Sequence, residues 1–303
     1  MSGMTISRPS SGEMHVCFMG SLSSGKTTLL NHFLGRTDER ASGVKPTVAL
    51  EYTYARKDEG ASKIVSHIHE LGGGTQLLHL LPVIKCDVAI IMLNLMEGST
   101  VLTQLDAFYA GLQAAVEQRQ KQENSSNNSN AATAAETSPI KSGLVESSLP
   151  VLCIFPTHWD EAINLESEER RILSRALRWW ACRHSASLIY LSTKDRSSLS
   201  LAKNVLNSLC FEGTLPTLRH SVDHALPILA CAGSEELDDI GMPGDGSTWQ
   251  EMVQKAFGKR DSKVVTQERV DLEWTKFKEH AIDSIRQQKD EELQRKRRED
   301  RRY

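Results

Sequence analysis

The chain has 303 residues, 39% of them hydrophobic and 25% charged, a composition that predicts a soluble protein with one large domain plus an appendage, or two domains. Its formal net charge of −3 argues against a general nucleic-acid-binding protein, which is usually basic. We also expect an intracellular protein without a transmembrane segment, because no apolar run reaches the roughly 18 residues that span a bilayer.

Residues 1–13 are rich in Ser and Gly, lack the apolar core of a secretory signal, and are expected to be flexible. Strands and helices then alternate. The predicted strands lie at 14–19, 48–56, 63–69 and 87–95, and the predicted helices at 27–34 and 102–122. The run at 87–95 is almost continuously apolar, which is typical of a central strand covered on both faces.

A low-complexity polar segment at about 118–148 interrupts this alternation, and we expect it to be a disordered insertion because it has too little apolar surface to offset the entropy of ordering. The alternation then resumes, with predicted strands at 149–155 and 188–191 and predicted helices at 166–184 and 199–211. Residues 14–212 are therefore predicted to form an α/β domain with a doubly wound, mostly parallel sheet.

The C-terminal third is predicted to be an extension followed by a helix. The extension, residues 213–265, contains one further strand at 227–231 and an acidic loop rich in Gly and Pro at 233–246. Residues 266–303 have a sparse apolar stripe among many charges, which predicts a long charged helix suited to packing on the domain or on a partner.

The segment Gly20-Ser21-Leu22-Ser23-Ser24-Gly25-Lys26-Thr27 fits the phosphate-binding P-loop pattern. Its glycines let the backbone surround a phosphate, Lys26 reaches the outer phosphates, and the Thr27 hydroxyl is the expected Mg²⁺ ligand. The predicted nucleotide-binding residues of this segment are Gly20, Ser23, Ser24, Gly25, Lys26, Thr27 and Thr28. The alternative is a glycine-rich turn that never contacts a nucleotide.

Two positions correspond to the switch regions of a GTPase. Thr47 lies where a switch threonine senses Mg²⁺ and the γ-phosphate, although an ordinary loop threonine fits equally well. Glu70 replaces the aspartate of the Asp-x-x-Gly motif, and its extra methylene is expected to require a shifted backbone for a water-mediated Mg²⁺ contact. Gly74 stands where the catalytic glutamine would be, so hydrolysis is expected to be impaired, with Gln76 a weak substitute.

The base-recognition motif is altered. Thr157-His158-Trp159-Asp160 replaces Asn-Lys-x-Asp, so Asp160 can still accept hydrogen bonds from guanine. The aliphatic stem along the base and the amide that ties the loops together are expected to be lost. Ser192, Thr193 and Lys194 match the Ser-Ala-Lys position. The pattern favours guanine over adenine, so GDP or GTP with Mg²⁺ is the expected ligand.

His67 and His69 share one face of a predicted strand and raise the question of a metal site. The sequence shows no third ligand beside them, so packing or surface roles are expected.

Three segments together resemble the light intermediate chain family of cytoplasmic dynein: the P-loop 20–28, the run 45–54 and the run Glu70-Leu71-Gly72-Gly73-Gly74-Thr75. The runs around Glu51 and Glu70 are similar to the dynein-2 branch of that family, and the resemblance covers roughly residues 14–300. The chain also ends soon after the charged helix, without the long Ser/Pro-rich tail of the dynein-1 branch.

The resemblance implies a P-loop NTPase fold of the Ras-like GTPase type. It also implies a non-catalytic subunit that binds and stabilises the dynein-2 heavy chain, alongside other dynein-2 subunits and the intraflagellar transport machinery. It implies retrograde transport and cilium or flagellum assembly, and a location in the cytoplasm, the axoneme, the basal body and the cytoskeleton. No nucleic-acid partner is expected. The alternative is an active GTPase-like switch that hydrolyses GTP.

Overall fold

The structure is a computed structural model that describes residues 13–36, 45–59, 62–130, 149–212, 215–216, 218–241 and 246–258, with 284–285, 287–289, 291–292 and 295 near the C-terminus. The chain divides into two compact units, Met1–Asp261 and Ser262–Tyr303. Of the predicted flexible start, only Glu13 is described. In the second unit the described residues are helical, and Lys289 pairs with Glu292 at 2.9 Å. The rest of the predicted helix 266–303 lies outside the described residues.

One mixed sheet organises the first unit, with strand order β2-β3-β1-β4-β5-β6-β7. The strands are β1 (Glu13–Gly20), β2 (Leu50–Glu59), β3 (Ser62–Leu71), β4 (Val88–Asn94), β5 (Val151–Thr157), β6 (Ser187–Ile189) and β7 (Leu229–Ala230). The β1·β3, β1·β4, β4·β5 and β5·β6 pairs are parallel, whereas β2 and β7 join the two edges antiparallel. The predicted α/β fold with a mostly parallel, doubly wound sheet is confirmed.

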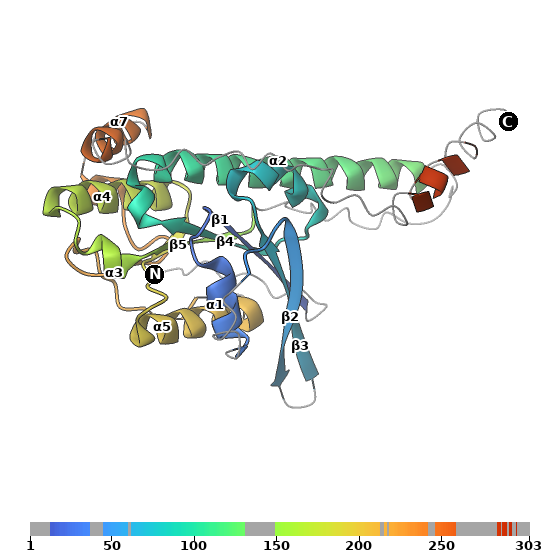
Figure 1. The fold of residues 1–303 in the computed structure, drawn as a ribbon, viewed down its shortest axis with the longest axis horizontal. Helices are drawn as coiled ribbons and strands as arrows, with labels where there is room; N and C mark the ends of the chain where they lie inside the picture. The colour runs from blue at the N-terminus through green and yellow to red at the C-terminus, as the bar shows by residue number, and fades with distance from the viewer. Residues whose placement is uncertain are drawn as a thin grey trace, which may run out of the picture. The chain divides into compact units, whose positions relative to one another are not determined.

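Helices cover both faces of this sheet (Figure 1). One face carries α1 (Lys26–Phe33) and α5 (Arg196–Asn207), the latter continued by the π-helical turn η5 (Ser208–Glu212). The other carries α2 (Val101–Asn130), α4 (Ser167–Arg183) and α7 (Gly246–Phe257). The short elements are η2 (Gly74–Val83), η3 (Leu95–Thr100), α3 (Trp159–Ala162) and α6 (Leu237–Ile240). Within the described residues no helix is both long and apolar enough to cross a membrane.

The side chains of β1 contribute to two hydrophobic cores, one on each face of the sheet. Val16 and Phe18 pack with α1 and α5, while Cys17 and Met19 pack with the helices of the opposite face. All four side chains are fully buried. Because alternate side chains of a strand point to opposite faces, a continuous apolar run is what a strand between two helical layers requires. That burial anchors the strand whose last residue begins the P-loop.

The predicted disordered insertion needs a correction at its start. Helix α2 continues to Asn130, so residues 118–130 are helical. This stretch is polar but contains neither Pro nor Gly, and an established helix propagates more easily than it starts, since each added residue gains a hydrogen bond. Residues 131–148 lie outside the described residues.

The extension packs more closely onto the domain than the sequence predicts. Its strand is confirmed but shorter, as β7. Helix α7, which the sequence analysis missed, buries Trp249, Val253 and Phe257, the last beside Gly98 of η3. On α4, the guanidinium of Arg178 forms a bidentate ion pair with Glu235, and both side chains are about nine-tenths buried. The extension is therefore an integral part of the first unit.

Candidate nucleotide-binding site

The P-loop joins the end of β1 to the start of α1, at the carboxyl edge of the sheet. A Cβ on Gly20 would lie 1.9 Å from the carbonyl oxygen of Met92, so only glycine fits where the loop passes β4. The Ser21 N–H donates to that same oxygen at 3.0 Å. Ser23 and Gly25 have φ values of 56° and 83°, and such left-handed residues let backbone N–H groups gather around an anion. The loop has the backbone of a phosphate site.

A cleft of about 340 Å³ opens above this loop, and it is lined by residues 22–28 together with Pro46, Thr47, Glu70, Gly72 and Gly73. Lys26 is buried, and its Nζ donates to the carbonyl oxygens of Ser21 at 2.8 Å and Gly20 at 3.2 Å. Burial lowers the pKa of Lys26, an effect that the carboxylates of Glu70 and Glu97 oppose. The ammonium group therefore lies at the cleft, held by the loop itself.

Glu70 and Thr27 form a hydrogen bond in the cleft. The Thr27 hydroxyl donates to Glu70 Oε1 at 2.6 Å, while Glu70 keeps its regular parallel register with Phe18. Glu70 is only 4% exposed. Burial raises the pKa of Glu70, although the Thr27 hydrogen bond and the Lys26 charge act in the opposite direction. The longer side chain thus reaches the Thr27 hydroxyl, which is the predicted Mg²⁺ ligand.

Of the residues at the switch positions, Thr47 and Glu70 line the cleft, whereas Gly74 and Gln76 do not. Thr47 lines the cleft, and its hydroxyl donates to Glu51 at 3.1 Å. A Cβ on Gly72 would lie 2.2 Å from the Thr47 carbonyl oxygen, so glycine is needed where the two loops meet. Gly74 begins η2 and offers no side chain to orient a water molecule. Gln76 is exposed on η2 and is not part of the cleft lining.

Thr157 corrects the prediction that the tie between the loops is lost. It is fully buried at the end of β5, and its hydroxyl lies 2.9 Å from the carbonyl oxygens of both Ser24 and Leu93. This single hydroxyl links the P-loop, β4 and β5. Sequence reasoning missed the role because residues 24, 93 and 157 become neighbours only in the fold.

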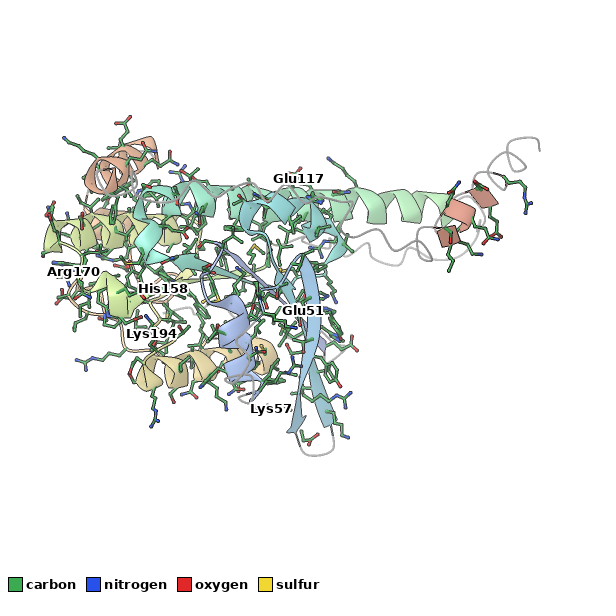
Figure 2. All side chains as sticks on the ribbon, in the orientation of Figure 1. Glu51, Lys57, Glu117, His158, Arg170 and Lys194 are labelled. Carbon is green, nitrogen blue, oxygen red and sulfur yellow. The ribbon has the colours of Figure 1, made fainter. Side chains whose placement is uncertain are left out.

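The base-recognition residues also come together, around Asp160 at the start of α3. Ser192 donates to Asp160 Oδ1 at 2.7 Å, and Lys194 Nζ lies 3.0 Å from Oδ2 and 2.6 Å from Glu161 (Figure 2 labels Lys194 and His158). Burial raises the pKa of Asp160, but the hydrogen bonds from Ser192 and Lys194 outweigh it and hold that pKa below its usual range. Asp160 is therefore ionised at neutral pH.

A curated protein from Danio rerio, "Cytoplasmic dynein 2 light intermediate chain 1", is 31% identical over 310 residues, which cover 94% of this chain and 85% of that protein. This chain belongs to the family of dynein-2 light intermediate chains. Proteins of the same name from Mus musculus and Homo sapiens are 28% and 27% identical, over 93% of this chain and 87% of theirs. No protein-family model matches the chain.

Solved structures with a related arrangement include the conserved domain of a dynein light intermediate chain, with a TM-score of 0.48, 16% identity and coverage of 79% of this chain and 89% of that one. A GDP-bound Roco2 protein from Methanosarcina barkeri has a TM-score of 0.38 and 12% identity, covering 70% and 52%. Both scores are below 0.5, so the family assignment rests on the sequence relatives.

The residues of this light intermediate chain fit a guanine nucleotide with Mg²⁺. Lys26 and the P-loop backbone would hold the phosphates. The Thr27 hydroxyl keeps oxygen lone pairs for Mg²⁺ while it donates to Glu70. Asp160 accepts hydrogen bonds from Ser192 and Lys194, and it would offer its remaining acceptor positions to the base. A Cβ on Gly25 would lie 3.3 Å from Thr193, which places the 192–194 loop against the P-loop.

Proposed function

We propose that this chain is a non-catalytic subunit of the dynein-2 motor, which binds and stabilises the heavy chain for retrograde intraflagellar transport and for cilium or flagellum assembly. One observation carries the proposal: relatives named as dynein-2 light intermediate chains align with 93–94% of the chain. The expected location follows from that role, in the cytoplasm, the axoneme, the basal body and the cytoskeleton. The motor ATPase would belong to the heavy chain.

Features of the cleft support a structural role for any bound nucleotide. Gly74 supplies no side chain to orient a catalytic water, and Glu70 already accepts a hydrogen bond from Thr27. The loop is also held by bonds to β4 and β5 that need no ligand. A ligand that binds only the folded state stabilises it by mass action, without a change of conformation. GDP or GTP would then act as part of the fold.

Affinity purification from ciliated cells tests the proposal. The tagged chain should recover the dynein-2 heavy chain and other dynein-2 subunits, identified by mass spectrometry. A matched purification of an unrelated tagged P-loop protein controls for non-specific capture. Reproducible recovery of the chain without any dynein-2 heavy chain would contradict the proposal.

The second candidate function is an active GTPase switch, which the intact P-loop and the cleft of about 340 Å³ favour. A turnover assay with purified protein and Mg²⁺-GTP separates the two. We expect no hydrolysis above background. Hydrolysis that is clearly measurable and lost in a folded Lys26→Ala variant would support the switch.

A further inference from the structure

A group of polar side chains lies at the start of β1 and in the middle of β3, away from the nucleotide cleft. In the parallel register of these strands His15 is the direct partner of His67, and Glu13 precedes His15 by two residues. Residues two apart on a strand share a face, so the three side chains project from the same side of the sheet. At about 3.3 Å per residue, the P-loop begins roughly 16–23 Å farther along β1.

The three side chains are close enough to share one ion. One ligand atom from each of Glu13, His15 and His67 lies within 4.8 Å of the others. The two imidazole rings stack with centroids 4.7 Å apart and planes 14° apart. Glu13 Oε2 lies 3.9 Å from His67 Nε2. Of the two histidines that share a strand face, only His67 belongs to this group, and its two neighbours, Glu13 and His15, both come from β1.

Two ring nitrogens in this group have no hydrogen-bond partner among the residues that the structure describes. They are His15 Nδ1 and His67 Nε2, and both atoms are buried. Buried polar atoms are normally satisfied, so an unpartnered nitrogen needs an explanation. The two nitrogens, together with the carboxylate of Glu13, supply such an explanation if they coordinate a cation.

The surroundings of His67 suit a metal ligand. Its Nδ1 lies 2.8 Å from the Tyr52 hydroxyl oxygen. When Nδ1–H donates to that oxygen, the lone pair is on Nε2, which faces Glu13. Metal-bound histidines usually have such a partner on the second nitrogen, which fixes the tautomer and the ring orientation. The His67 side chain is 23% exposed and that of Glu13 53%, so solvent and ions can enter.

We propose that Glu13, His15 and His67 bind one Zn²⁺ ion, with water completing the coordination. A set of two imidazole nitrogens and one carboxylate oxygen is a zinc donor set, whereas Mg²⁺ and Ca²⁺ prefer oxygen ligands. Zn–ligand bonds of about 2.0–2.2 Å require the ligand atoms to close to roughly 3.3 Å, a movement that the exposed Glu13 side chain permits. The ion links β1 to β3, the strands that carry the P-loop and Glu70. This inference does not depend on the dynein-2 assignment.

Metal binding by the purified full chain tests the proposal, with any polyhistidine tag removed and bound metal stripped first. Equilibrium dialysis against Zn²⁺ with elemental analysis should give one equivalent per chain. Glu13→Gln, His15→Gln and His67→Gln should each weaken binding about tenfold or more. The matched control is His79→Gln, which changes an exposed histidine on η2 and should bind as the wild type does. Binding that is unchanged in the three variants, or lost equally in the control, would overturn the site.

A second measurement needs no variant. Zn²⁺ should raise the Tm of the wild-type chain in a concentration-dependent way, whereas Mg²⁺ at the same concentrations should not. Co²⁺ in place of Zn²⁺ should give the visible absorption of a site with nitrogen and oxygen ligands. If the wild type shows neither the Zn²⁺-specific Tm shift nor the Co²⁺ absorption, the proposal is wrong whatever the variants do.

Discussion

Glu70 is 4% exposed, and its carboxyl group accepts a hydrogen bond from Thr27. Its pKa is raised by burial, so ionising it costs more in the folded chain than in the unfolded chain. Linkage gives the direction of the pH effect. The raised pKa contributes to the free energy of unfolding at pH values below the pKa that Glu70 has in the unfolded chain, and this contribution is lost as the pH rises through the pKa of Glu70 in the folded chain.

Glu70→Gln removes this pH-dependent cost and keeps an oxygen that can accept from Thr27. In nucleotide-free protein we expect the variant to have the higher free energy of unfolding at pH 8, and the difference to shrink as pH falls through the raised pKa of Glu70. Urea unfolding at several pH values measures this, with Glu117→Gln on α2 as the control on an exposed carboxylate. A difference that grows toward low pH would contradict the account.

Thr157 offers a second test at the scale of one hydroxyl group. Thr157→Val keeps the side-chain shape but leaves the Ser24 and Leu93 carbonyl oxygens without this donor. We expect a loss of about 1–3 kcal/mol of unfolding free energy, which is the usual cost of an unsatisfied buried group. Thr157→Ser retains the hydroxyl and should lose less. Equal stability of the valine variant and the wild type would show that the link between the loops carries no energy.

At the residue scale the sequence predicts the P-loop well, but it does not predict the side-chain contacts between separate strands and loops. Gly20 to Thr28 are neighbours in the chain, so their pattern is visible in the sequence. The hydrogen bonds of the Thr157 hydroxyl form only because the fold brings the P-loop and the ends of β4 and β5 together. In the same way His67 gains Glu13 and His15 as neighbours only when β1 pairs with β3.

Among the elements, α4 and the extension are joined by a buried ion pair between Arg178 and Glu235. Removing one partner leaves a buried charge uncompensated, so Arg178→Met or Glu235→Leu alone should cost about 3–5 kcal/mol of unfolding free energy. The double variant should lose less unfolding free energy than the two single variants lose in sum. Chemical denaturation of the wild type, the two single variants and the double variant measures this coupling energy.

The matched comparison is the exposed pair Arg171–Glu168 on the same helix. Exposed pairs contribute little because solvent screens them. Arg171→Ala should therefore leave the unfolding midpoint nearly unchanged. If Arg178→Met were equally mild, the extension would not be held as the structure indicates.

Element prediction succeeds where the apolar pattern is long and fails where it is interrupted. The central strands follow from continuous apolar runs, because helices bury both of their faces. Helix α7 has apolar residues at helical spacing, Trp249, Val253 and Phe257, but the acidic Gly/Pro-rich stretch before it suggested a loop. Helix α2 extends into a polar stretch that composition alone assigns to disorder.

At the scale of the molecule, the first unit combines a P-loop domain with an extension that buries Trp249 and Phe257 against it. Under the proposed function, this domain serves as a stable binding unit rather than as a switch. Its affinity for the heavy chain should then not depend on which guanine nucleotide is present.

Complex formation with the tail of the dynein-2 heavy chain tests the central proposal most directly. The purified full chain and the tail would be mixed without nucleotide, with GDP, or with a non-hydrolysable GTP analogue, and the mass of the complex measured by light scattering after size-exclusion chromatography. We predict a stable complex of the same stoichiometry in all three conditions. No complex in any condition would contradict the subunit assignment, and a complex formed only with the GTP analogue would show that the chain is a switch.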